Sequence, residues 1–290
     1  MTDPDFAAGL VLGAIGATCL NVGKGIQKMK VQVLRHGRDA FRAPHRRDLA
    51  VWFVGWLMTS SAGIFYSLAL ARTDQPSAIA SMTGAGLVAL VVFSALVLHE
   101  RIGAVELAGV ALVVIGTATV SGLHGVRNAG AGFDVRDLML WSGSVLGLWV
   151  LPVTYTLVTG RFHGTVFGSL AGSLIGIAMI WGNISMTVSH GNFWHQFASP
   201  FIYLAMLTGT AALVLTQVAF LRSRAVVVVP CSNSLMILVP ALLERAILGV
   251  SIGRGQMVGI AAIVAGIVLM TATREPASGG PPGMDGAVAV

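Results

Sequence analysis

Charged residues divide this chain into long apolar windows that contain no Asp, Glu, Lys or Arg. The windows run over 6–23, 49–71, 75–99, 107–126, 138–160, 162–221, 225–243 and 255–273. A helix needs about 17–25 apolar residues to cross a bilayer. Seven windows fit one crossing each, and the window 162–221 fits two, divided by a polar turn at 189–192. The sequence therefore predicts an all-α integral membrane protein with about nine transmembrane helices.

The charge content agrees with this class. Only 10% of the 290 residues are charged, against roughly 25% in soluble domains. The net charge of +6 does not indicate nucleic-acid binding, because eight of the eighteen Lys and Arg residues lie between 24 and 47. We interpret 24–50 as a basic cytoplasmic loop that faces anionic lipid headgroups. A gated vestibule for substrate is the alternative interpretation of this loop.

Placing that loop inside sets the predicted orientation in a plasma (inner) membrane. The N-terminus is then outside and the C-terminus cytoplasmic. Thirteen Lys and Arg residues fall on the inner side and five on the outer side, as the positive-inside rule requires. The tail 274–290 is rich in Gly and Pro and is predicted to be a disordered cytoplasmic segment.

The chain also contains a weak internal repeat. A shift of 150 residues aligns 51–120 with 201–270 without a gap, and three glycines keep their spacing. In the predicted topology the two segments point in opposite directions, so the halves 1–122 (four helices) and 138–273 (five helices) form inverted repeats. Inverted repeats are typical of secondary transporters, because two equivalent halves can exchange inward- and outward-facing shapes.

Several short motifs resemble the drug/metabolite transporter (DMT) superfamily of EamA-like domains. The first half has Ala-Leu-Ala at 69–71, a small-residue stretch at 77–81, and Glu-Arg-Ile-Gly at 100–103 before a Gly-spaced helix. The second half adds Gln217, Val229-Pro230 and Glu244. With four spans followed by five, the pattern is similar to the NIPA-type magnesium transporter branch over roughly residues 7–273. The superfamily usually has ten helices, so one helix of the first half is missing.

The resemblance implies transport by alternating access through a central cavity, and in the NIPA-type branch it implies Mg²⁺ as the cargo. The residues favour a neutral or zwitterionic solute at least as well. Mg²⁺ prefers carboxylate oxygens and water, and no acidic residue lies near the middle of a predicted span. We therefore expect a secondary transporter of a small polar solute, with a NIPA-like Mg²⁺ transporter as the alternative. A non-transporting membrane subunit or lipid-handling partner, whose eighth span packs dry, is the third hypothesis.

The eighth predicted span, 226–248, carries the main candidate site. Pro230 and Pro240 interrupt its apolar run, and Asn233 and Ser234 lie between them. Broken helix hydrogen bonds and polar side chains are costly in lipid unless protein or water satisfies them. Asn233 serves equally well as a hydrogen-bonding contact between helices, and Pro230 as a proline tolerated near a helix start. The candidate substrate-binding residues are Asn233, Ser234, Gln217, Pro230, Asn21 and Tyr66.

The remaining candidates depend on their place along each span. Gln217 falls in the same inner half of the membrane as Asn233, so the two side chains are expected to hydrogen-bond. Asn21 lies near the end of the first span, where placement at the membrane interface is the competing explanation. Tyr66 lines a cavity or belongs to the aromatic belt. Glu244, near the outer end of the eighth span, is the one candidate metal ligand or proton relay, against snorkelling to the headgroups.

Two further patterns predict structure. Gly168, Gly172 and Gly176 recur every four residues, which predicts close helix packing. Glu100 and Arg101 are predicted to form an interfacial pair that fixes their own turn.

The sequence contains no nucleotide-binding loop, catalytic triad or zinc cluster. We therefore expect no enzyme, no ATP-driven step and no cofactor. The expected partners are a small-molecule or cation substrate and membrane lipids, with no nucleic acid. A homodimer is left open, as is coupling to protons, to an ion gradient or to facilitated diffusion.

Overall fold

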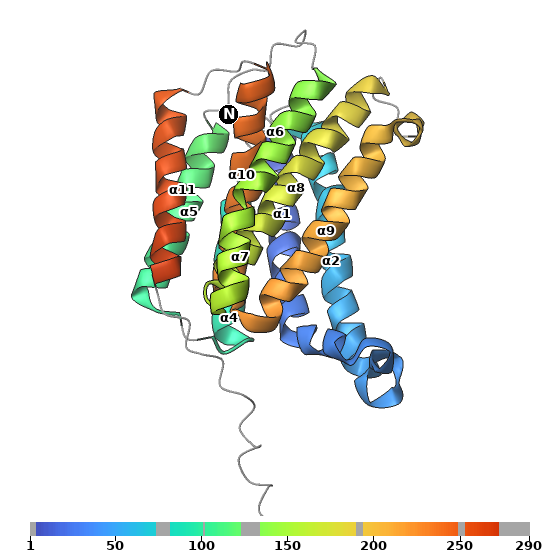
Figure 1. The fold of residues 1–290 in the computed structure, drawn as a ribbon, viewed down its shortest axis with the longest axis vertical. Coiled ribbons are helices and arrows are strands. Elements are labelled where there is room, and N and C mark those ends of the chain that lie inside the picture. The colour runs from blue at the N-terminus through green and yellow to red at the C-terminus, as the bar shows by residue number, and fades with distance from the viewer. Residues whose placement is uncertain are drawn as a thin grey trace, which may run out of the picture.

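The computed structural model describes residues 4–73, 82–100, 102–122, 134–189, 194–248 and 253–272. These residues are helical, without a strand among them, and the helices form one bundle (Figure 1). The helices are α1 (Pro4–Lys30), α2 (Ala43–Thr73), α4 (Thr83–Leu96), α5 (Ala104–Gly122), α6 (Val135–Leu148), α7 (Val150–Thr159), α8 (His163–Val188), α9 (Pro200–Arg222), α10 (Ala225–Leu248) and α11 (Arg254–Ala272). Two 3₁₀ helices, η1 (Val31–Phe41) and η2 (His195–Ala198), complete them. The predicted all-α class is confirmed.

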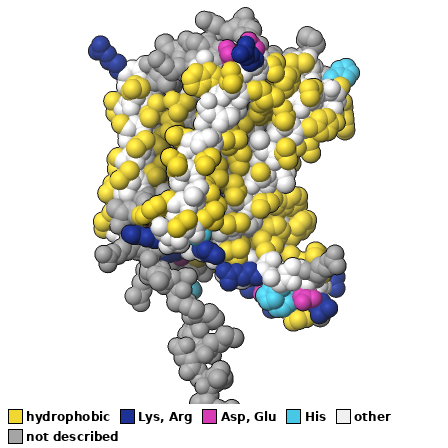
Figure 2. Space-filling model, in the orientation of Figure 1, with side chains coloured by type: hydrophobic (Ala, Val, Ile, Leu, Met, Phe, Trp, Pro, Cys, Tyr) yellow, Lys and Arg dark blue, Asp and Glu magenta, His cyan; other side chains and the backbone are white. Residues whose placement is uncertain are grey.

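The wall of the bundle is apolar and its charges gather at the two ends (Figure 2). Six segments are long and apolar enough to cross a membrane: Ala7–Gly37, Pro44–Tyr66, Val135–Thr159, His163–Gly182, Pro200–Arg222 and Ala225–Leu243. Large apolar side chains stand exposed between the ends, among them Leu151 at 80% and Val158 at 81% exposure. A continuous apolar surface of this kind is stable against lipid rather than water. The chain is an integral membrane protein.

Three further apolar helices are shorter: Gly84–Leu96, Ala104–Val120 and Arg254–Met270. They overlap the third, fourth and ninth predicted spans and belong to the same bundle (Figure 1). The count of nine spans stays a prediction, because only six of the described segments meet the length criterion. Residues 77–81 of the third predicted span and the predicted disordered tail 274–290 lie outside the described residues.

The predicted basic loop 24–50 is largely helical. α1 continues to Lys30, η1 follows, and α2 begins at Ala43. Lys24 therefore belongs to the first helix, where its side chain is only 4% exposed. The end of a charge-free window is thus a poor marker for the end of a helix when the bundle interior supplies a partner for the charge.

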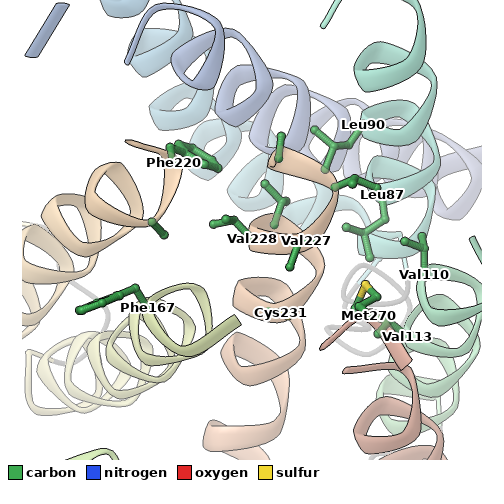
Figure 3. Close-up of a cluster of buried hydrophobic side chains, with 14 of the residues drawn as sticks. Leu87, Leu90, Val110, Val113, Phe167, Phe220, Val227, Val228, Cys231 and Met270 are labelled. Atoms are coloured by element: carbon green, nitrogen blue, oxygen red, sulfur yellow. The ribbon is translucent and has the colours of Figure 1, made fainter. Parts of the chain in front are cut away.

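α10 lies at the centre of the bundle, and every side chain from 225 to 234 is buried. Its first turns are surrounded by apolar side chains from five other helices (Figure 3). These side chains include Leu87 and Leu90 of α4, Val110 and Val113 of α5, Phe167 of α8, Phe220 of α9 and Met270 of α11. A helix enclosed on all sides in this way can keep polar side chains away from lipid.

Glycines set the closest helix contacts. A Cβ on Gly168, Gly172 or Gly176 of α8 would approach α10 more closely than 3.0 Å, which confirms their predicted packing role. On the other side of the bundle α5 and α11 cross antiparallel, with Gly109 against Gly266 and Gly116 against Gly259. A Cβ on Gly116 would lie 2.7 Å from the Gly259 carbonyl oxygen. Both contacts require the absence of a side chain.

Gly116→Ala should push α5 away from α11. The added methyl group meets backbone, which cannot rotate aside, so the free energy of unfolding in detergent should fall by roughly 1–3 kcal/mol. Gly143→Ala is the matched control, because nothing lies within 4 Å of a Cβ at that position in α6 and alanine favours helix. Equal unfolding midpoints for the two variants would contradict the close crossing of α5 and α11.

Candidate functional site

A buried polar cluster connects α1 with α10. Lys24 Nζ donates to Asn233 Oδ1 at 3.0 Å, and Asn233 Nδ2 donates to Asn21 Oδ1 at 2.5 Å. Asn21 Nδ2 in turn donates to the Ala17 carbonyl oxygen at 2.8 Å. Asn21 and Asn233 are fully buried. We call these three side chains the Lys24–Asn233–Asn21 cluster.

Lys24 sets the direction of every hydrogen bond in the cluster. An ammonium group donates and never accepts, so the oxygen of the Asn233 amide must face it. The nitrogen of that amide then faces Asn21, whose oxygen accepts, and the nitrogen of Asn21 is left for the backbone of its own helix. Asn21 and Lys24 can reach the same residue of α10 because they lie three positions apart on one face of α1.

The charge of Lys24 is not neutralised by a carboxylate in the described part of the chain. Its one hydrogen bond there goes to a neutral amide, and the described ion pairs belong to other cations, Lys30, Arg42 and Arg224. Asn233 lies eight residues after Ala225, which is about 12 Å along α10. A charged side chain at such a depth is costly, and in membrane proteins it usually marks a functional site.

A second group of hydrogen bonds lies one turn further along α1. Gln27 Nε2 donates to Thr59 Oγ1 of α2 at 2.9 Å, while Gln27 Oε1 accepts from Gln217 Nε2 at 2.6 Å. Trp52 Nε1 donates to Gln217 Oε1 at 3.1 Å. The expected hydrogen bond between Gln217 and Asn233 is therefore wrong, because each of the two amides binds a different residue of α1.

Asn21 of α1 and Asn233 of α10 are predicted site residues that the structure brings into direct contact across two helices. The Asn21 side chain is fully buried inside the bundle, and its placement at the level of the membrane interface stays a prediction. Ser234 Oγ donates to the Pro230 carbonyl oxygen at 2.7 Å, so this hydroxyl is satisfied within its own helix. Tyr66 lies beside Gly16 of α1, about 8 Å along that helix from Asn21.

The proposed metal ligand stays a prediction. Glu244 lies in α10, eleven residues after Asn233, which is about 16 Å along the helix. Its side chain is outside the described part of the chain. Within the described residues, no group of three His, Cys, Asp or Glu side chains is placed to hold a metal ion.

Lys24 and Gln27 are the site residues that sequence reasoning missed. Asn21, Lys24 and Gln27 recur every three residues and share one face of a helix. No proline separates them, so a helix that continued past the charge-free window would present all three side chains together. That spacing was the signal that could have placed Lys24 inside the bundle.

Opposite charges cap the two helices that meet at the turn before α10. The Glu100 carboxylate accepts from the backbone N–H groups of Ala225 and Val226, at 2.9 and 3.3 Å. Lys28 Nζ donates to the carbonyl oxygen of Phe220 in the last turn of α9. A negative charge at a helix N-terminus and a positive charge at a helix C-terminus both favour the helix dipoles. The predicted pair of Glu100 with Arg101 stays a prediction, because Arg101 lies outside the described residues. The contacts of the Glu100 carboxylate with the start of α10 are an addition that the sequence did not predict.

An ion pair holds the same turn against α5. Arg224 pairs with Glu106, and Glu106 Oε2 also accepts from Gly103 N at 2.9 Å at the start of α5. At the start of α11, Gln256 Oε1 accepts from Gly253 N at 3.0 Å in the same way. The two helices therefore begin with equivalent caps, and only the cap of α5 carries a charge.

Asn233→Leu should destabilise the fold, because it leaves the buried Lys24 ammonium without its hydrogen bond. We expect a loss of roughly 2–3 kcal/mol. Adding Lys24→Met should recover much of that loss, because two apolar side chains then replace a broken polar pair. Chemical denaturation of the wild type, both single variants and the double variant in detergent measures the coupling. Strictly additive losses would contradict the direct contact.

Comparisons with protein-family models, with curated proteins and with solved structures gave no match for this chain.

Proposed function

We propose that this chain is a secondary membrane transporter, built on the plan of the DMT superfamily, that moves a small polar solute by alternating access. The observation that carries the proposal is the Lys24–Asn233–Asn21 cluster. It puts a charge that no described carboxylate neutralises between α1 and α10 inside a membrane protein. Packing alone does not call for that charge, because apolar side chains of similar volume fill such a contact at no greater cost. Binding of a solute would account for the charge on Lys24.

The pattern of helix contacts supports the two repeats of the proposal. α1 packs antiparallel to α2 and parallel to α4, and α8 packs in the same way on α9 and α10. α5 and α11 pack on each other through two glycine contacts, Gly109 with Gly266 and Gly116 with Gly259. In the alignment offset by 150 residues, Gly109 corresponds to Gly259 and Gly116 to Gly266, so each contact maps onto the other. Such an exchange is expected of two halves related by a two-fold axis in the membrane plane.

α6 packs on α8 and α10, and α7 packs on α8. Together they form one apolar segment long enough for a crossing. The contacts above pair α1 with α8, α2 with α9, α4 with α10 and α5 with α11, so this segment has no counterpart among α1, α2, α4 and α5.

The Lys24–Asn233–Asn21 cluster supports Mg²⁺ as the cargo less well than it supports a small polar solute. The Lys24 ammonium already binds the Asn233 amide oxygen and would repel a divalent cation. Glu244 lies about 16 Å further along α10. Rescue of a Mg²⁺-uptake-deficient host by the wild type, lost in Glu244→Gln, would favour magnesium over the proposed solute.

The non-transporting alternative matches one feature of the structure. Asn233 is fully buried and both ends of its amide are hydrogen-bonded to α1, as dry packing requires. Dry packing does not account for the charge on Lys24, since an ammonium group costs more to bury than a third amide would.

Purified protein in proteoliposomes should catalyse counterflow of a labelled solute from a panel of amines, amino acids, nucleosides, organic acids and lipid precursors. Asn233→Ala should lower the rate about tenfold or more, because it removes the bond that positions Lys24. Thr210→Val is the control, since that hydroxyl is exposed on the wall of α9 and bonds only its own helix, to the Met206 carbonyl oxygen. Absence of counterflow for every class of solute would contradict the proposal.

The proposal places the end of the bundle that carries η1 in the cytoplasm, as the thirteen-to-five distribution of Lys and Arg predicts. A reporter that is active only in the periplasm should be active when fused after Val126 and inactive when fused after Arg38. The reverse pattern of activity would overturn this orientation.

A further inference from the structure

We infer that the transported solute carries an oxyanion group, a carboxylate or a phosphate, and that this group binds Lys24 Nζ. The inference rests on the proposed transport function and names the class of solute. It concerns a residue that the sequence patterns alone assign to a surface loop.

The Lys24 ammonium has hydrogen-bonding capacity that no described residue uses. The group has three N–H donors, and in the described part of the chain one of them is used, toward Asn233. The side chain is 4% exposed, so bulk water has little access to the others. A carboxylate or phosphate oxygen would accept from them and neutralise the charge, which a neutral solute would not do.

The described side chains of the site carry no negative charge. Asn21, Asn233, Gln27, Gln217 and Trp52 are all uncharged, and Lys24 is the one charged member. An amine or a metal cation bound beside Lys24 would add a second positive charge with nothing among these side chains to offset either. The site therefore selects against cations.

The end of the bundle that carries η1 is rich in basic residues. η1 carries Arg35 and the start of α2 carries Arg46 and Arg47, and Figure 2 shows Lys and Arg side chains along this edge of the molecule. Arg42, between the two helices, pairs with Asp39. A positive field of this kind raises the local concentration of anions. The same field would also attract anionic lipid headgroups, so a test must separate a lipid from a free solute.

The experiment uses full-length protein in proteoliposomes and solutes in matched pairs: glutamate with glutamine, and glycerol 3-phosphate with glycerol, with choline as the cation. At least one anion should be taken up, and its neutral partner should not. Lys24→Gln should lower that uptake by about thirtyfold or more, because it removes the charge that the anion binds. Lys24→Arg keeps the charge and should retain a measurable part of the uptake.

Lys30→Gln is the matched control, because it removes the same charge from the same helix. Its side chain is 34% exposed and pairs with Asp48, outside the cluster, so anion uptake should stay at the wild-type rate. Gel filtration and helical content confirm that each variant is folded. If Lys24→Gln does not fold, the preference of the wild type within each matched pair still decides the inference.

Other outcomes contradict the inference in distinguishable ways. Uptake of glutamine, glycerol or choline without uptake of either anion would overturn the anionic class and leave transport standing. Equal anion uptake by the wild type and Lys24→Gln would remove Lys24 from recognition. Binding of phosphatidylglycerol that is lost in Lys24→Gln, without uptake of any anion, would assign the site to a lipid headgroup and overturn the inference. No uptake of any solute would contradict both the inference and the transport function.

Discussion

The structure depends on the enclosure of α10. This helix contains two prolines and the run Cys-Ser-Asn-Ser at 231–234, which could not face lipid without unsatisfied polar groups. Three features of the bundle keep α10 away from lipid and bind its polar groups. Glycines of α8 let the backbone of α10 approach closely, Glu100 binds its first N–H groups, and Asn21 and Lys24 complete the hydrogen bonds of Asn233. Each device comes from a different part of the chain, so the halves must pack together before α10 is stable.

Enclosure explains why polar groups are tolerated, but it does not explain why one of them is charged. A third amide at position 24 could also donate to Asn233 at a smaller desolvation cost. The ammonium adds a charge that Asn233 does not neutralise and donors that Asn233 does not use. Under the proposed transport function, a ligand with its own negative charge would use this residual capacity. Lys28, four residues further along α1, shows the contrasting case, because it binds the C-terminal end of α9, where a cation stabilises the helix.

Much of the fold follows from the distribution of charge along the sequence. Charge-free windows predicted the helices, and glycines spaced by four predicted close packing of α8, whose partner α10 only the structure identifies. The failures lie where a long-range partner supports a polar residue. The charge-free window ended at Gly23 and so left out Lys24 and Gln27, whose hydrogen-bond partners Asn233 and Gln217 lie about two hundred residues away in sequence. The contacts of Glu100 with the backbone N–H groups of Ala225 and Val226 were likewise not predicted. Local pattern cannot reveal such pairings, since helix packing determines them.

The central claim is that Asn233 lies on a path that opens alternately to the two sides of the membrane. It can be tested with Asn233→Cys in a chain whose native Cys19 and Cys231 are replaced by alanine. In sealed vesicles, the rate of modification by a membrane-impermeant thiol reagent is measured from each side, with and without the transported solute. The account predicts slow modification from both sides and protection by the solute. No modification from either side, in a variant shown to be folded, would mean that α10 is permanently packed and would contradict the account.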